Sequence, residues 1–135
     1  MIKQTEIVIR TTKRGFFVIT DEILNNVNIS NIKMGMMNIF LKHTSASLSI
    51  NENASSDVRI DLENFSSDLI DNKNYIHSYE GEDDMPAHIK SSLFGVSLNI
   101  PITNGKLNIG IWQGIYLNEH RNTPQHRKIV ITIYY

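Results

Sequence analysis

The sequence predicts an α+β fold: a mostly antiparallel β-sheet packed with two or three helices. Three observations support this fold class. Strand-like segments occupy both ends of the chain, segments with helical periodicity lie between them, and Asn104-Gly105 is a strong hairpin signal between two later strands. A chain of 135 residues is typical of one domain, so we expect residues 1–135 to form a single unit.

The first elements are strands around a basic turn. Residues 6–10 and 15–19 are rich in Val, Ile and Phe, and the turn at 12–15 predicts a hairpin between them. Thr20 is a candidate N-cap of a short helix. Residues 34–42 are almost continuously apolar, which predicts a buried strand.

Residues 44–50 alternate between apolar and hydroxyl side chains. Since neighbouring strand residues point to opposite faces, one face is apolar and the other carries a row of serines. The apolar face consists of Ala46, Leu48 and Ile50, and the hydroxyl face consists of Ser45, Ser47 and Ser49. The hydroxyls are either the solvated face of the sheet or a site that holds a phosphate or carboxylate.

Two helices are predicted in the middle of the chain. Residues 56–70 carry an apolar stripe at helical spacing, which we expect to be buried: Val58, Leu62, Phe65 and Leu69. Residues 86–94 follow, with Pro86 in a first turn and Gly95 as the terminator.

Strands return at residues 96–102, 106–117 and 128–135. Pro101 cannot donate a ladder hydrogen bond, so its strand is expected at a sheet edge or at a bulge.

Composition narrows the function. The chain has no cysteine, which excludes disulfides, thiolate nucleophiles and cysteine-ligated metal sites and fits a cytoplasmic protein. A net charge of −1 offers no electrostatic reason for nucleic acid binding. No long apolar stretch is present, so we expect neither a signal peptide nor a membrane span.

Reactive side chains concentrate in two polar segments, residues 75–88 and 110–121. They contain three of the five histidines and five of the fourteen carboxylates. Imidazole, carboxylate and guanidinium groups together are typical of acid–base, metal or phosphate chemistry.

Each candidate also has a plainer interpretation. His43 at a strand end and Glu52 in a turn are either site residues or ordinary polar residues. Asp84 is interpreted as a helix cap. His88 then lies in the first helical turn, where the positive helix end favours a neutral imidazole that accepts a proton or binds a metal. Trp112 either stacks on a ligand or anchors the core, with the core preferred.

The second polar segment ends in Glu119-His120-Arg121. Arg121 can contact phosphate or carboxylate in bidentate fashion, and the alternative is a surface salt-bridge cluster. No glycine-rich phosphate loop or His-Glu-x-x-His helix is present. The residues alone predict one polar site that binds a metal or a phosphate, built from His43, His77, Glu80, His88, His120 and Arg121.

The same residues carry a family resemblance. The matching segments are His43-Thr44-Ser45-Ala46-Ser47, Asn51-Glu52-Asn53-Ala54, Tyr75-Ile76-His77, Glu80-Gly81, residues 83–90, residues 97–102, Gly105, residues 110–115 and Glu119-His120-Arg121. In these segments the chain resembles the YjbQ family, also described as a secondary thiamine-phosphate synthase family. The chain departs from the family pattern at Ile111, where threonine is usual, and at Ser55-Ser56, where Asp-Pro is frequent.

The resemblance implies an α+β homotrimer and a weak thiamine-phosphate synthase activity. That reaction joins hydroxymethylpyrimidine diphosphate to thiazole phosphate and releases pyrophosphate. Because negative charge develops on pyrophosphate, we expect cations to assist it: a divalent metal (Mg²⁺ or Zn²⁺), Arg121 and Lys90. The expected partner is therefore a small phosphorylated molecule.

We assign hypothetical roles on this basis. The catalytic candidates are His43, Glu52, His88, Glu119 and Arg121. The substrate-binding candidates are Ser45, Ser47, Asn51, Lys90, Trp112 and Gln113, and the metal-ligand candidates are His77, Glu80, His88 and His120. Two other functions stay open: a metal-dependent hydrolase, and a non-catalytic protein that binds a small phosphorylated or carboxylated ligand.

Overall fold

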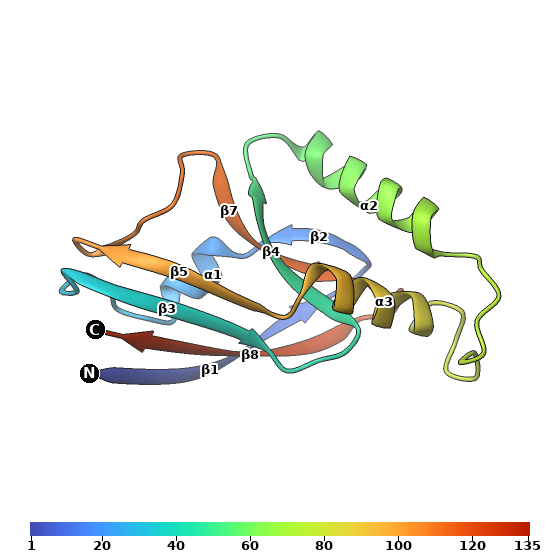
Figure 1. Cartoon of the computed structure of the whole chain (residues 1–135), viewed down its shortest axis with the longest axis horizontal. Helices are drawn as coiled ribbons and strands as arrows, with labels where there is room; N and C mark the ends of the chain where they lie inside the picture. The colour runs from blue at the N-terminus through green and yellow to red at the C-terminus, as the bar shows by residue number, and fades with distance from the viewer.

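Two antiparallel β-sheets pack against each other in the computed structural model, which describes all 135 residues (Figure 1). The large sheet has the strand order β1 (Ile2–Thr11), β8 (Gln125–Tyr134), β3 (Met34–Leu41), β5 (Ser97–Thr103) and β6 (Lys106–Leu107). The small sheet has the order β2 (Gly15–Val18), β7 (Gln113–Glu119) and β4 (Ala46–Glu52). The helices are α1 (Thr20–Asn25), α2 (Ser56–Ile70) and α3 (Asp84–Phe94). The predicted α+β class with antiparallel sheets is confirmed.

The hydrophobic core lies between the two sheets. It contains 17 buried apolar side chains from both sheets and from the segments around α1. In the small sheet, Leu48 of β4 lies opposite Leu117 of β7, and Ile50 lies opposite Ile115, so the apolar face of each strand points into this core. The predicted apolar face of β4 is therefore the core face.

The other face of the small sheet is covered by helices. In Figure 1, α2 and α3 lie over this sheet, with α3 packed on β4 and α2 on β2. Ser47 is consequently fully buried and Ser49 is half-buried. Of the two interpretations of the serine row, the solvated face does not hold at Ser47, because α3 covers it.

Three other local predictions are wrong. β1 and β2 form no hairpin, since β1 pairs with β8 and β2 pairs with β7, and the turn between them crosses from one sheet to the other. The predicted strand 106–117 is broken, because a turn at Gly110 lets the chain pass from β6 to β7. In that turn the Gly110 N–H donates to Gln113 Oε1 at 2.7 Å.

The third concerns the buried face of α2. Phe65 and Leu69 are 72% and 55% exposed, whereas Ser66 and Ile70 are buried. The face of α2 that packs towards the small sheet includes a charged contact. Glu63 of α2 lies 3.6 Å from the guanidinium of Arg14, which precedes β2. The C-terminal half of the predicted apolar stripe is thus turned away from the sheet, whereas its N-terminal half, Val58 and Leu62, is half-buried.

A buried ion pair joins the two sheets. Glu119 ends β7 and Arg127 lies in β8, and both are buried. Arg127 Nε donates to Glu119 Oε1 at 2.7 Å, and Arg127 Nη2 donates to Glu119 Oε2. The Thr11 hydroxyl also donates to Oε1 at 2.7 Å, and the Arg121 N–H donates to Oε2 at 3.1 Å. Arg127 Nη2 reaches the Ser45 carbonyl at 3.2 Å, so both charges are well paired.

A second polar layer lies beneath the helices. Lys90 of α3 is fully buried, and its Nζ lies 3.0 Å from Asp71 Oδ1 at the end of α2. Asp71 Oδ2 lies 2.7 Å from Arg14 Nη1. Burial by itself would raise the pKa of Asp71, but the contacts with Lys90 and Arg14 outweigh burial and lower it. Lys90 and Arg14 thereby tie the end of α2 to α3 and to the β1–β2 turn.

His120 lies in the same layer. It is fully buried, and its Nε2 is 2.9 Å from the Ser47 hydroxyl oxygen. Burial lowers the pKa of His120 to about 3, and the positive charges of Lys90 and Arg14 act in the same direction. Two aromatic rings pack against the imidazole, those of Phe16 and Phe94. This histidine is therefore neutral at physiological pH.

None of the three helices is long and apolar enough to cross a membrane.

We expect Glu119→Ala to lower the free energy of unfolding by about 3–5 kcal/mol, because it leaves the buried Arg127 charge without its partner. Urea denaturation measures this loss. The control is Glu6→Ala, which removes a carboxylate from an exposed ion pair with Lys42 and should leave the midpoint nearly unchanged. Similar midpoints for the two variants would contradict a structural role for the buried pair.

We also expect His120 to make stability depend on pH. Its pKa is about 3 in the folded chain and about 6.5 when unfolded, so between these values the unfolded state binds more protons. Stability then falls as the pH is lowered from about 6.5 towards 3, by about 1.4 kcal/mol per pH unit from this group. His120→Gln should flatten that part of a urea-denaturation pH series. His126→Gln, at an exposed position of β8, is the control, and an unchanged slope in His120→Gln would refute the assignment.

Candidate functional site

Two histidines and one aspartate meet at the N-terminal end of α3. His77 Nε2 lies 2.8 Å from Asp84 Oδ2, and His88 Nε2 lies 3.1 Å from the same oxygen. One ligand atom from each residue can be chosen so that all three lie within 4.8 Å of one another. We call His77, Asp84 and His88 the His-Asp cluster.

Local structure explains how these residues meet. Asp84 is the first residue of α3, and His88 follows one helical turn later, so both side chains lie on one helix face. His77 comes from the loop that connects α2 to α3, and the ring of Tyr79 packs edge-on against it at 4.9 Å. Asp84 is buried, while both imidazoles are partly exposed. The cluster is therefore accessible from its histidine side.

Arg121 holds the carboxylate of Asp84. Its Nη1 lies 2.5 Å from Asp84 Oδ1, which leaves Oδ2 for the two histidines. Its Nε donates to Asp83 Oδ2 at 3.0 Å, and its Nη2 donates to the Glu80 carbonyl at 3.1 Å. Burial would raise the pKa of Asp83, but the Asn122 N–H and Arg121 outweigh burial and lower it. All of these contacts position Asp84.

A backbone carbonyl orients His88. Its Nδ1 lies 2.7 Å from the Thr44 carbonyl oxygen, which can only accept a hydrogen bond. Nδ1 is therefore assigned the proton, and in a neutral ring Nε2 carries a lone pair directed at Asp84 Oδ2. Two lone pairs 3.1 Å apart repel each other, so a cation between them, either a second proton or a metal ion, is favourable. A carbonyl behind a ligating imidazole is also the usual outer-sphere partner in metal sites.

The donor set indicates which metal fits. Two imidazole nitrogens and one carboxylate oxygen suit Zn²⁺ and related transition metals, whereas Mg²⁺ prefers oxygen ligands and several waters. Three protein ligands leave a coordination position for water or substrate, as in catalytic zinc sites. Of the two predicted metals, Zn²⁺ fits the cluster better.

An open groove of about 940 Å³ runs beside the cluster. His88 and His43 both line it, together with Phe40, Thr44 and Ser91. His43 Nε2 accepts a hydrogen bond from the backbone N–H of residue 128 at 2.8 Å. Burial lowers the pKa of His43, and the charge of Arg127 lowers it further. A neutral His43 therefore carries its proton on Nδ1, the ring nitrogen that is left to meet a ligand.

The structure brings together two of the four predicted metal ligands, His77 and His88. Glu80 approaches the site only through its backbone carbonyl, which accepts from Arg121. His120 lies under the helices against Ser47 and outside the cluster. The carboxylate that meets the two histidines is instead that of Asp84.

Three of the predicted catalytic residues contact other protein groups instead of facing the groove. Glu119 is the buried partner of Arg127, and Arg121 holds Asp84. The carboxylate of Glu52 accepts from the backbone N–H groups of residues 54 and 55 at 3.1 and 3.4 Å, just before α2. Glu52 and Glu119 thus stabilise the fold, and their carboxylates are not free to bind a ligand.

The predicted substrate-binding residues are dispersed. Lys90 is fully buried against Asp71 and is not free to bind phosphate. Ser47 is buried against His120, and Ser45 contributes its carbonyl to Arg127.

The other three substrate-binding candidates lie at the far end of the small sheet. Asn51 is aligned with Gly114, next to Gln113, whereas the cluster lies beside Thr44 at the start of β4. Asn51 lies seven positions after Thr44 in this extended segment, which corresponds to about 20 Å. Trp112 is 61% exposed, so the preferred interpretation as a core anchor is wrong.

Sequence reasoning missed Asp84 because the helix was predicted to begin at Pro86. With the observed start at Asp84, the spacing of four residues to His88 places both on one face. An Asp-x-x-x-His spacing at a helix start was the available signal.

Comparison with known proteins gives a consistent result. A family model described as "UPF0047 protein YjbQ-like" matches residues 5–135. The chain is 46% identical over 132 residues to the UPF0047 protein YjbQ of Escherichia coli O157:H7, with 96% of each chain covered. It is 44% identical to the UPF0047 protein sll1880 of Synechocystis, with 96% of this chain and 90% of that protein covered.

Solved structures agree with these relatives. A YjbQ/UPF0047 family protein of Clostridium acetobutylicum superimposes with a TM-score of 0.84 at 38% identity, covering 94% of this chain and 97% of that one. A YbjQ-like protein of Sulfolobus solfataricus superimposes with a TM-score of 0.84 at 25% identity, covering 98% of each. The chain therefore belongs to the YjbQ-like UPF0047 family.

Proposed function

We propose that this chain is a metal-dependent hydrolase whose metal centre is the His-Asp cluster. The observation that carries the proposal is the convergence of His77, Asp84 and His88, with Nε2 of His88 3.1 Å from the Asp84 carboxylate. A bound Zn²⁺ would supply a hydroxide nucleophile near neutral pH by lowering the pKa of its water.

The chain's own residues prepare this chemistry. Arg121 holds Oδ1 of Asp84 and leaves Oδ2 directed at the histidines, so the carboxylate needs little rearrangement to bind a cation. The Thr44 carbonyl fixes the proton of His88 on Nδ1 and keeps Nε2 available. In the adjoining groove, His43 keeps Nδ1–H as a donor for a substrate oxygen, because its Nε2 is occupied by the backbone N–H of residue 128.

Thiamine-phosphate synthase activity, with a small phosphorylated substrate, stays a prediction from the family resemblance. The two protein cations expected to stabilise pyrophosphate, Arg121 and Lys90, are both committed to carboxylates. The transferase would therefore depend on a bound divalent metal alone for the positive charge that a leaving diphosphate requires.

A homotrimer likewise stays a prediction, and exposed apolar groups near the cluster favour it. Ile76 and Tyr79 flank His77 and are almost entirely exposed, so a subunit contact over this loop would bury both side chains. A neighbouring subunit over this loop would shield the cluster from water.

Metal binding tests the proposal directly. We expect the purified protein, loaded with Zn²⁺ and dialysed, to retain about one ion per chain by elemental analysis, because three ligands converge. His77→Ala and His88→Ala should each lose the ion, whereas His126→Ala on β8 should keep it. Equal retention in all four proteins would refute the centre.

Activity is the second measurement. The Zn²⁺-loaded protein is assayed with ester, amide and phosphate monoester substrates, and separately for pyrophosphate release from the two thiamine precursors. Hydrolysis that is lost with chelator and in His88→Ala supports the proposal. Pyrophosphate release without hydrolysis would favour the transferase, and stoichiometric metal without any turnover would favour a binding protein.

We further expect Arg121→Met to weaken Zn²⁺ binding about 10–100-fold, because the side chain that orients Asp84 is lost. Arg121→Lys should recover only part of the affinity, since lysine cannot hold Asp83 and Asp84 with one planar group. Competition with a chromogenic chelator measures both affinities. Wild-type affinity in Arg121→Met would show that Asp84 needs no such support.

A further inference from the structure

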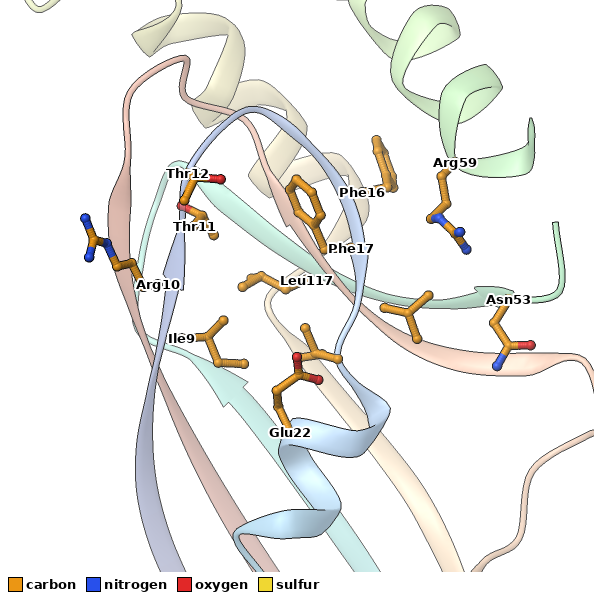
Figure 2. A pocket seen from close by; sticks show the side chains of 12 residues that line it. Ile9, Arg10, Thr11, Thr12, Phe16, Phe17, Glu22, Asn53, Arg59 and Leu117 are labelled. Carbon is orange, nitrogen blue, oxygen red and sulfur yellow. The ribbon is translucent and has the colours of Figure 1, made fainter. Parts of the chain in front are cut away.

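A second pocket, with a volume of about 530 Å³, opens beside β2 and shares no residue with the His-Asp cluster (Figure 2). β1 and β2 are edge strands of their respective sheets, so the pocket lies at an open side of the sandwich. Its volume falls within the range of pockets that bind small molecules, about 300–1,000 Å³.

The pocket has a substantial apolar wall. Ile9, Phe17, Val18 and Leu117 line it, and half of its twelve lining residues are hydrophobic. Phe17 and Val18 remain partly exposed although they belong to a strand of the small sheet. An apolar body placed here would cover surface that the fold itself leaves open to water.

A free guanidinium lies at one side of this wall. Arg59 extends from the first turn of α2, and in Figure 2 its side chain points towards Asn53. Arg59 is half-buried and makes no hydrogen bond or ion pair with the rest of the chain. Every other arginine that is at least half-buried is held by a carboxylate, which sets Arg59 apart (Arg14, Arg121, Arg127).

Asn53 is a fixed neighbour of Arg59. Its backbone N–H donates to the Trp112 carbonyl at 2.9 Å. Its side chain packs on Gly114, where an added Cβ would lie 2.9 Å from the amide nitrogen. The Asn53 side-chain amide has no partner within the chain, so it is available to a ligand together with Arg59.

A carboxylate lies on another side of the pocket. Glu22 extends from α1 towards the pocket in Figure 2 and forms no ion pair. Its negative charge disfavours a second anionic group there. The pocket thus combines one anion-binding corner, an apolar wall and one anion-repelling corner.

We propose that this pocket binds a small apolar molecule that carries a single anionic group. Arg59 and Asn53 bind the anionic group, because a guanidinium pairs with a carboxylate through two parallel hydrogen bonds. The apolar body lies on Ile9, Phe17 and Val18, the partly exposed apolar residues of the pocket. The site is independent of the proposed metal centre.

The test is an NMR titration of the full chain with 3-phenylpropionate, and with 3-phenylpropan-1-ol as the uncharged control compound. We expect 3-phenylpropionate to shift amide signals of β2 and residue 53 with one site per chain, and the alcohol to bind at least fivefold more weakly. Arg59→Gln should weaken 3-phenylpropionate binding at least fivefold. Arg10→Gln is the matched control, because Arg10 borders the pocket but points away from it in Figure 2.

Three results would overturn the proposal: no saturable shifts around β2, equal affinity for the acid and the alcohol, or equal affinity in wild type and Arg59→Gln. Should Arg59→Gln disturb the spectrum of the free protein, Gly114→Ala is the second variant, because it displaces Asn53 and should also weaken the acid. His77→Ala should bind the acid as wild type does, so this test is independent of the metal centre.

Discussion

The buried Glu119–Arg127 ion pair is the constraint on which the arrangement of this molecule depends. Removing two charges from water is costly unless both are fully paired, and here the Thr11 hydroxyl, the Arg121 N–H and the Ser45 carbonyl complete the pairing. These partners come from both sheets, so the sheets have one relative position in which the pair is satisfied. The end of β7, where Glu119 lies, is therefore held in one position relative to the large sheet.

The side chains of three consecutive residues at this end of β7 contact three different parts of the molecule. Glu119 lies between the sheets, His120 lies beneath the helices, and Arg121 reaches Asp83 and Asp84. Strand alternation directs Glu119 and His120 to opposite sides, and the chain has left β7 before Arg121. Burial of Glu119 consequently positions the guanidinium that orients the carboxylate of the cluster. α3 acts in the same way, because the helix that carries His88 also carries Lys90, which holds the end of α2 where the loop to His77 begins.

Local patterns in the sequence were sufficient for the fold class but not for the partners of each element. The alternation at Leu48 and Ile50 identified the core face correctly, because it depends only on strand geometry. It could not show that α3 covers the opposite face. The stripe at Phe65 and Leu69 was misleading because α2 packs through charged contacts with Arg14 instead. His77 and His88 were identified by residue type, whereas Asp84 required the true start of α3.

The charges around the cluster explain why a dication is the occupant that fits best. Asp83 and Asp84 contribute two negative charges and Arg121 contributes one positive charge, so the group is negative when the histidines are neutral. A divalent ion at Asp84 Oδ2 would reverse this sign and leave a local positive charge beside the groove that His43 and His88 line. Arg121 would remain on Oδ1, because the two oxygens of Asp84 serve different partners. The same carboxylate is therefore neutralised by protein on one side, and a metal bound on its other side would keep part of its charge for a substrate.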